Sequence, residues 1–173
     1  MKISINCGHT VKFAGYGSVY GSFKESQITR AIGNEVIRLL REGGHTVHNS
    51  TVNYAISQKH YLKRVVEMAN AKEIDLFISL HCNASSTRMG HGTEVYTYKG
   101  KRLPVAVSIC NKLSSLGFKN RGVKDGSNLY VVKNTKAPAI LVEVCFIDNP
   151  LDIDLYKKWG YKNIAKTIVE GIV

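Results

Sequence analysis

The sequence is poor in the features that mark membrane-spanning, fibrous or multi-domain chains. Its 173 residues include only three prolines and one tryptophan, and they contain no repeat, low-complexity tract or Pro/Ser-rich linker. No apolar run approaches the roughly 20 residues that a helix needs to cross a bilayer. We therefore predict one compact domain, spanning residues 1–173, without a membrane span.

Cysteine is also scarce, and its spacing does not match the common cysteine-based metal motifs. The four cysteines are Cys7, Cys82, Cys110 and Cys145, and no two of them form a CxxC pair. Three of them lie in or beside apolar runs, and no secretory signal accompanies them. The pattern therefore favours free, buried thiols over disulfides.

Acidic residues are few, since 13 Asp and Glu stand against 24 Lys and Arg, which gives a net charge of +11. Such a charge attracts polyanions in general, so nucleic acid, an anionic membrane surface and anionic cell-wall polymers all fit as partners. No block of five or six like charges indicates a nucleic-acid-binding arm, and we expect no specific nucleic-acid partner. Residues 1–6 show no signal peptide, so we expect the chain to be made in the cytoplasm.

What the sequence does contain is a regular alternation of apolar strands with helical periodicity. The predicted strands cover residues 2–6, 45–48, 75–80, 93–98, 129–132 and 139–142. Apolar residues at helical spacing predict helices over residues 25–41, after a Ser57 cap, from Pro104 to Gly117, and after Pro150. Strands that alternate with helices are typical of an α/β fold with a mainly parallel sheet.

Four polar residues are expected at one edge of that sheet. His9 follows the first predicted strand and Gly8, whose missing side chain permits a sharp turn. His81 ends the third predicted strand and Glu143 the last, while Glu25 begins the first helix. Because ligand sites of such sheets lie beyond the carboxyl ends of the strands, we expect these four side chains to meet.

Two imidazoles and one carboxylate with an open position are a common shell for catalytic zinc. Zinc acidifies a bound water, and a second carboxylate can take its proton and pass it to a leaving nitrogen. Glu143 follows an apolar run, which is a desolvated place for such a carboxylate. Taken singly, each residue is more often a hydrogen-bonded structural residue, and Glu25 could simply complement a helix dipole. The metal site is therefore a hypothesis that depends on the predicted fold.

The remaining candidates carry weaker signals. Asn83 is predicted either to contact substrate or to brace its loop, and His91, between two glycines, is a candidate for substrate contact. Cys82 should point away from His81 by strand alternation, and a Cys7 thiolate would oppose an open hydrolytic geometry. The other histidines are expected at the surface, and they are His45, His48 and His60. The glycines of a long loop between His9 and Glu25, expected to be mobile and to flank the substrate groove, are Gly15, Gly17 and Gly21.

Four segments stand out as motifs, and they are Asn6-Cys7-Gly8-His9, Phe23-Lys24-Glu25, Ile78-Ser79-Leu80-His81-Cys82-Asn83-Ala84 and Leu141-Val142-Glu143-Val144-Cys145-Phe146. Together they closely resemble the catalytic domains of zinc N-acetylmuramoyl-L-alanine amidases of type 3, a family of bacterial autolysins and phage endolysins. The resemblance extends from Lys2 to about Ile172. The sequence departs from the family before the first histidine, where Asp-Pro-Gly-His-Gly is common.

The resemblance implies a three-layer α/β sandwich, phosphorylase/hydrolase-like, with a twisted, about six-stranded sheet flanked by helices. It implies one Zn²⁺ ion on His9, Glu25 and His81, with Glu143 as the catalytic acid/base. The implied reaction is hydrolysis of the peptidoglycan amide between N-acetylmuramic acid and the L-alanine of the stem peptide. We expect a monomer that acts on the wall after release, as a phage endolysin or during mother-cell lysis, without the wall-binding domain that relatives usually carry.

Three alternatives stay open at this point. One is a zinc carboxypeptidase that acts on stem peptides, and another is a non-catalytic module that binds walls or polyanions. The third is a cysteine hydrolase built on Cys7 or Cys82, which would keep its activity in a strong zinc chelator.

Overall fold

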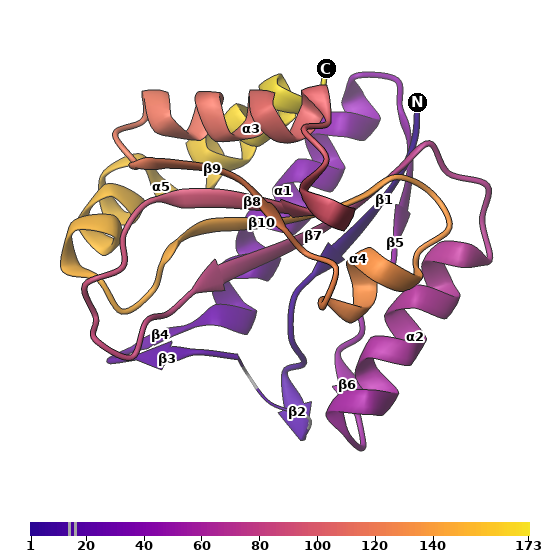
Figure 1. Ribbon diagram of the computed structural model, residues 1–173, viewed down its shortest axis with the longest axis horizontal. Helices are drawn as coiled ribbons and strands as arrows, with labels where there is room; N and C mark the ends of the chain where they lie inside the picture. Colours follow the sequence, from indigo (N-terminus) through magenta and orange to yellow (C-terminus); the bar gives the residue numbers. More distant parts are fainter. Residues whose placement is uncertain (14, 16) are drawn as a thin grey trace.

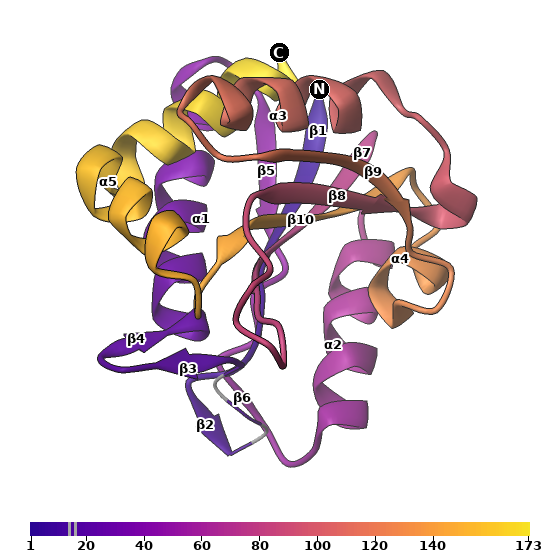
Figure 2. The same cartoon turned by 60° about the vertical axis from the view of Figure 1, so that its left-hand side comes forward.

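A computed structural model describes residues 1–13, 15 and 17–173, and it contains a six-stranded sheet between two layers of helices (Figures 1 and 2). The strand order is β5-β1-β7-β10-β8-β9. The strands are β1 (Lys2–Cys7), β5 (Thr46–Asn49), β7 (Leu76–Asn83), β8 (Thr93–Thr97), β9 (Asn120–Asp125) and β10 (Ala139–Phe146). This arrangement confirms the predicted three-layer α/β sandwich with a mainly parallel sheet.

Strand direction decides which residues reach the functional edge. The strands β5, β1, β7 and β10 run parallel to one another. The strands β8 and β9 run parallel to each other and antiparallel to these four. The carboxyl ends of the first four strands therefore share one edge with the amino ends of β8 and β9.

Helices cover the two faces of the sheet unequally. One face is covered by three helices, α1 (Glu25–Glu42), α3 (Pro104–Ser115) and α5 (Pro150–Ile172). The other face is covered by α2 (Gln58–Asn70) and the short α4 (Tyr130–Asn134). Ser57 caps α2 as predicted, because its side chain accepts a hydrogen bond from the backbone N–H of His60.

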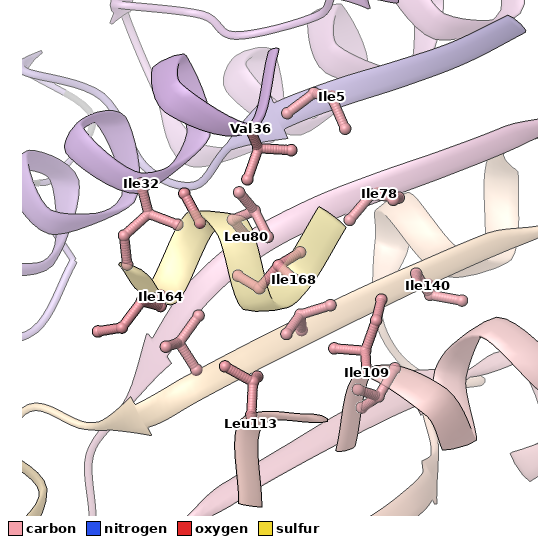
Figure 3. Close-up of a cluster of buried hydrophobic side chains, with 14 of the residues drawn as sticks. Ile5, Ile32, Val36, Ile78, Leu80, Ile109, Leu113, Ile140, Ile164 and Ile168 are labelled. Carbon is pink, nitrogen blue, oxygen red and sulfur yellow. The ribbon is translucent and has the colours of Figure 1, made fainter. Parts of the chain in front are cut away.

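The larger hydrophobic core lies under the three-helix layer (Figure 3). Ile32 and Val36 of α1 pack there with Leu80 of β7, and all three are fully buried. Burial of such a side chain contributes roughly 1.5–3 kcal/mol relative to exposure. Leu40 of α1 is fully buried, whereas its neighbour Leu39 is only half-buried.

Two short strand pairs lie outside the main sheet, in and around the segment between His9 and Glu25. They are β2 (Lys12–Phe13) with β6 (Tyr54–Ala55), and β3 (Val19–Tyr20) with β4 (Phe23–Lys24). A single 3₁₀ turn, η1 (Tyr98–Gly100), follows β8. Among the described residues, no helix combines the length and apolarity that a membrane span requires.

One predicted strand is wrong. Residues 129–132 are helical from Tyr130 onward, as part of α4. Val131 and Val132 give this run an apolar, β-branched character, but both are buried in the smaller core against α2. A short apolar run does not distinguish a strand from a turn of buried helix, so packing decided between them.

Candidate metal centre

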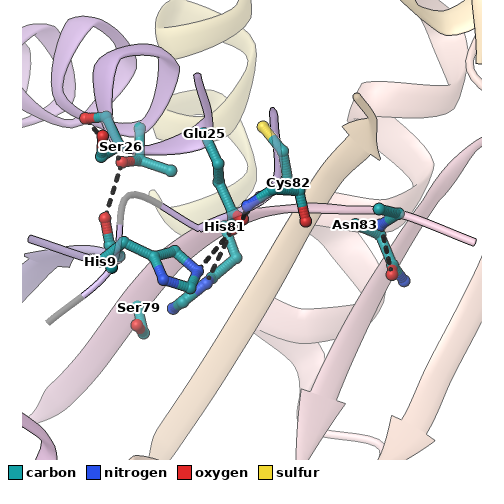
Figure 4. A network of polar contacts seen from close by, with 12 residues as sticks. His9, Glu25, Ser26, Ser79, His81, Cys82 and Asn83 are labelled. Atoms are coloured by element: carbon teal, nitrogen blue, oxygen red, sulfur yellow. Dashed lines mark hydrogen bonds and ion pairs between the residues drawn. The ribbon is translucent and has the colours of Figure 1, made fainter. Parts of the chain in front are cut away.

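Two histidines and one glutamate meet at the carboxyl edge of the sheet (Figure 4). The Nε2 atom of His9 lies 3.0 Å from Oε1 of Glu25, and the Nδ1 atom of His81 lies 3.1 Å from the same oxygen. The three ligand atoms all lie within 4.8 Å of one another, and the trio could hold a metal ion. The structure therefore brings together three residues that are 16 and 56 positions apart in the chain, as predicted.

The separations suit a small tetrahedral ion. Bonds of about 2.0–2.1 Å at a tetrahedral angle place ligand atoms roughly 3.4 Å apart. The observed 3.0 and 3.1 Å from Oε1 of Glu25 to the two imidazole nitrogens are close to this value and slightly shorter. Nitrogen and carboxylate ligands in this number are those of an open zinc site rather than a closed structural one.

The backbone around His9 is held in a demanding conformation. His9 has a φ of 65°, a value uncommon for a residue with a side chain. Gly8 does not have a positive φ, so the sharp turn falls on His9 rather than on the glycine. The glycine is required for a different reason from the expected one, since a Cβ on Gly8 would lie 2.4 Å from the His81 ring. Arg30 of α1 stabilises the turn, because its guanidinium donates to the carbonyl oxygens of Gly8 (3.2 Å) and His9 (2.8 Å).

Glu25 is buried and fully engaged. Its Oε1 accepts the backbone N–H of Cys82 at 3.0 Å, and its Oε2 accepts that of Ser18 at 2.8 Å. Burial alone would raise the pKa of Glu25, but hydrogen bonds and charges from His81 and His9 outweigh it and hold that pKa well below its ordinary value. Ser18, from the segment that precedes α1, thus helps to hold the Glu25 carboxylate in place.

Glu143 lies beside the trio, and unlike Glu25 it has a carboxyl oxygen without a hydrogen-bond partner among the described residues. Its strand neighbours are His81 on β7 and Glu94 on β8. Its Oε2 atom is buried and has no hydrogen-bond partner among the described residues. Burial, together with the negative charges of Glu25 and Glu94, raises the pKa of Glu143 well above its ordinary value.

A polar network that sequence analysis missed continues from Glu143 across the sheet. Asn83 donates to Oε1 of the buried Glu94 at 2.7 Å, so the amide braces this network. Tyr96 donates to the same oxygen at 2.9 Å, and Arg121 donates to Oε2 at 2.8 Å. Glu94 and Arg121 were not among the predicted site residues, because nothing in the sequence indicated that they face the site.

The other candidates lie outside the trio. His91 lines a separate hollow of about 610 Å³ with Lys119 and Leu151, next to α5. Cys82 packs in the larger core, and burial raises the pKa of Cys7, which disfavours the thiolate that ligation requires. All four cysteines are free and buried, as predicted. The histidines expected at the surface are half-buried, and they are His45, His48 and His60.

Fold and site together define an α/β protein with a His-Glu-His group that could hold a metal ion at the carboxyl edge of its sheet. The sequence model of the N-acetylmuramoyl-L-alanine amidase family matches residues 3–173. The chain therefore belongs to this family of amidases.

Individual relatives agree with that assignment. An uncharacterized protein of Clostridium perfringens strain 13 is 35% identical over 99% of this chain and 51% of its own length. The N-acetylmuramoyl-L-alanine amidase LytC of Bacillus subtilis is 39% identical over 65% of this chain and 24% of its own length. The solved catalytic domain of the CD27L endolysin targeting Clostridia difficile superposes with a TM-score of 0.89 at 35% identity, covering 99% of this chain and 96% of that one. The chain spans about half the length of the first curated relatives that it matches.

Proposed function

We propose that this chain is the catalytic unit of a zinc-dependent amidase that cuts peptidoglycan between N-acetylmuramic acid and the L-alanine of the stem peptide. The observation that carries the proposal is the pairing of the His9-Glu25-His81 group with the unpartnered, buried oxygen of Glu143. One carboxylate is engaged and ionised, while the neighbouring one is left with a free acceptor atom. Family membership supplies the class of substrate.

His9, Glu25 and His81 would hold the single zinc ion. A bound zinc ion supplies Lewis acidity, which polarises a carbonyl group and acidifies water. Glu143 then serves as the proton carrier, accepting a proton from the attacking water at Oε2 and delivering it to the leaving amine nitrogen. Its raised pKa suits this role, because a more basic carboxylate takes up a proton more readily and can hold it until the leaving nitrogen accepts it.

We propose the cell wall as the place of action. One relative is named an endolysin of Bacillus phage SPP1, and it is 39% identical over 60% of this chain. The net charge of +11 favours accumulation on anionic wall polymers, although it plays no part in the chemistry. In longer proteins of this family the matching half would be the hydrolytic part.

Metal analysis and product analysis together test the proposal. The zinc-loaded chain should contain one zinc ion, lose its activity in a strong chelator and recover when zinc is restored. Digested walls should release free N-terminal alanine, and mass spectrometry should find glycan chains stripped of whole peptides. Activity that persists in chelator and falls on thiol alkylation would instead indicate a cysteine hydrolase. Release of single C-terminal amino acids would indicate a carboxypeptidase, and sedimentation with walls without any product would indicate a binding module.

A further inference from the structure

A row of charged side chains crosses the sheet from the metal centre toward its edge. The strand register places His81 opposite Glu143, and Glu143 opposite Glu94. Arg121 of the edge strand β9 completes the row through its hydrogen bond to Glu94. Glu143 lies two residues after Leu141 on β10, so by strand alternation it faces the side of the sheet that carries the smaller core.

A β-bulge directs Arg121 toward this row. The register between β8 and β9 shifts at this point, which leaves both Arg121 and Gly122 opposite Glu94. Gly122 has a φ of 76°, which residues with side chains rarely adopt, so glycine permits the bulge. Bulges re-aim side chains, and here the guanidinium reaches Glu94.

The guanidinium of Arg121 is fixed from two sides. Its Nε donates to Oε2 of Glu94 at 2.8 Å, and the Phe146 ring lies 4.9 Å from its central carbon. Glu94 is itself fixed by Asn83 and Tyr96. A planar group held on one edge and stacked on one face loses little freedom when it binds a ligand with its remaining edge.

The edge of the Arg121 guanidinium that carries the two Nη atoms is available for a ligand, unlike that of Arg30. Arg30 uses Nε, Nη1 and Nη2 to bind Asn53 and the carbonyl oxygens around His9. In the part of the chain that the structure describes, no residue accepts a hydrogen bond from either Nη atom of Arg121. The side chain of Arg121 is 31% exposed, while that of Glu94 is only 3% exposed.

We propose that the Nη atoms of Arg121 bind a carboxylate of the wall peptide, which makes Arg121 a specificity-determining residue of the amidase. The inference rests on the proposed function. The carboxyl group of muramic acid is consumed in the scissile amide, so a free carboxylate must come from the peptide side. A guanidinium fork matches a planar carboxylate with two parallel hydrogen bonds.

The distance limits which part of the peptide can be bound. Phe146, under the guanidinium, belongs to β10, and β10 is the direct neighbour of the His81 strand. One to two strand spacings correspond to about 5–10 Å. An extended peptide covers that distance in about two to three residues. The carboxylate therefore belongs to the second or third residue of the peptide.

Binding of free peptides tests the inference without relying on hydrolysis. The probes are C-terminally amidated tripeptides that begin with L-alanine and carry glutamate or glutamine at the second or third position. Calorimetry on the zinc-loaded chain should find one glutamate peptide bound on the order of tenfold more tightly than its glutamine twin. In Arg121→Lys, which keeps the charge beside Glu94 but loses the fork, this preference should fall to about twofold or less.

The controls separate recognition from structural support. Arg64→Lys changes an exposed arginine on α2 and should keep the full preference. Thermal unfolding of Arg121→Lys shows whether the hydrogen bonds around Glu94 still support the fold. A double variant, Arg121→Gln with Glu94→Gln, removes the guanidinium without leaving a buried charge unpaired. A wild-type chain that binds both peptides of every pair equally, or an Arg121→Lys variant that keeps the preference, overturns the inference. Release of N-terminal alanine from walls, measured separately, reports on the amidase proposal itself.

Discussion

Two glutamates lie within the same centre, and the contacts around their carboxyl groups differ in number and in charge. Glu25 is engaged by four partners, namely the His9 and His81 rings and the backbone N–H groups of Ser18 and Cys82. Glu143 has a buried oxygen without any partner among the described residues. The pKa of the first is lowered and that of the second is raised. Groups whose environments move their pKa values apart serve different roles in one reaction.

The comparison teaches how one fold produces both roles. Glu25 stands at the start of α1, where loop and strand backbone donors converge on it. Glu143 stands in the middle of the sheet, between His81 and Glu94, where burial and like charges oppose ionisation. The proposed ligand region around Glu25 is rich in hydrogen-bond donors and the proposed proton-carrying region around Glu143 is poor in them, and the variants below test that contrast.

Removal of a ligand should have the largest effect. His81→Ala is expected to lower zinc affinity by more than about 100-fold and to abolish activity, because the trio loses one of its three ligand atoms. Zinc content after dialysis measures the first effect and wall lysis the second. His60→Ala, which changes a histidine of α2 outside the trio, should keep both. A full zinc content in His81→Ala would contradict the ligand assignment.

The Glu143→Gln variant separates the two regions. It should keep zinc, because Glu143 is not in the trio, and lose about 10²–10⁴-fold in kcat, because the proton carrier is gone. Turnover of a muramoyl-peptide and zinc content, measured on the same preparation, provide the comparison. Normal turnover would remove Glu143 from the mechanism, and loss of zinc would place it among the ligands instead.

Loss of Arg30, which holds the backbone around His9, should weaken zinc binding less than loss of a ligand does. Arg30→Lys is expected to weaken zinc binding by about 10–100-fold, because lysine cannot hold the carbonyl oxygens of Gly8 and His9 at once. Competition with a chelating dye measures the affinity, and Arg64→Lys serves as the matched control. Unchanged affinity would mean that His9 keeps its positive φ without this support.

The fold and the meeting of His9, Glu25 and His81 could be predicted from sequence because both follow from the carboxyl ends of parallel strands. His9 lies just beyond the end of β1, His81 and Glu143 lie toward the carboxyl ends of β7 and β10, and Glu25 begins α1. Glu94 and Arg121 could not be found in this way. They lie near the amino ends of β8 and β9, which reach the same edge only because β8 runs antiparallel to β10.

The bulge that directs Arg121 and the helix that replaced the predicted strand at 129–132 share a further cause. In both places the local sequence permits more than one backbone path, and contacts with distant residues select one. The hydrogen bond to Glu94 favours the bulged path at Arg121. Packing in the smaller core favours the helical path at Val131 and Val132. Single-sequence patterns contain no information about such partners.

The smallest expected effect concerns stability rather than rate. In zinc-stripped protein, Glu143→Gln should raise the free energy of unfolding at pH 7 by about 1–3 kcal/mol, because glutamine removes the cost of placing an unpartnered charge at a buried oxygen beside Glu25 and Glu94. The raised pKa means that the native state binds more protons than the unfolded state above about pH 4, so wild-type stability falls as pH rises through that window. The gain should therefore vanish near pH 4, where both states hold the proton.

Glu25→Gln should behave oppositely in the same urea titrations. Its lowered pKa contributes stability above the unfolded value, and this contribution is lost only as pH falls toward the native value. The variant should therefore be less stable than wild type at pH 7, and the deficit should shrink in acid. Equal signs for the two variants at pH 7 would show that the two glutamates do not differ as the contacts around them indicate.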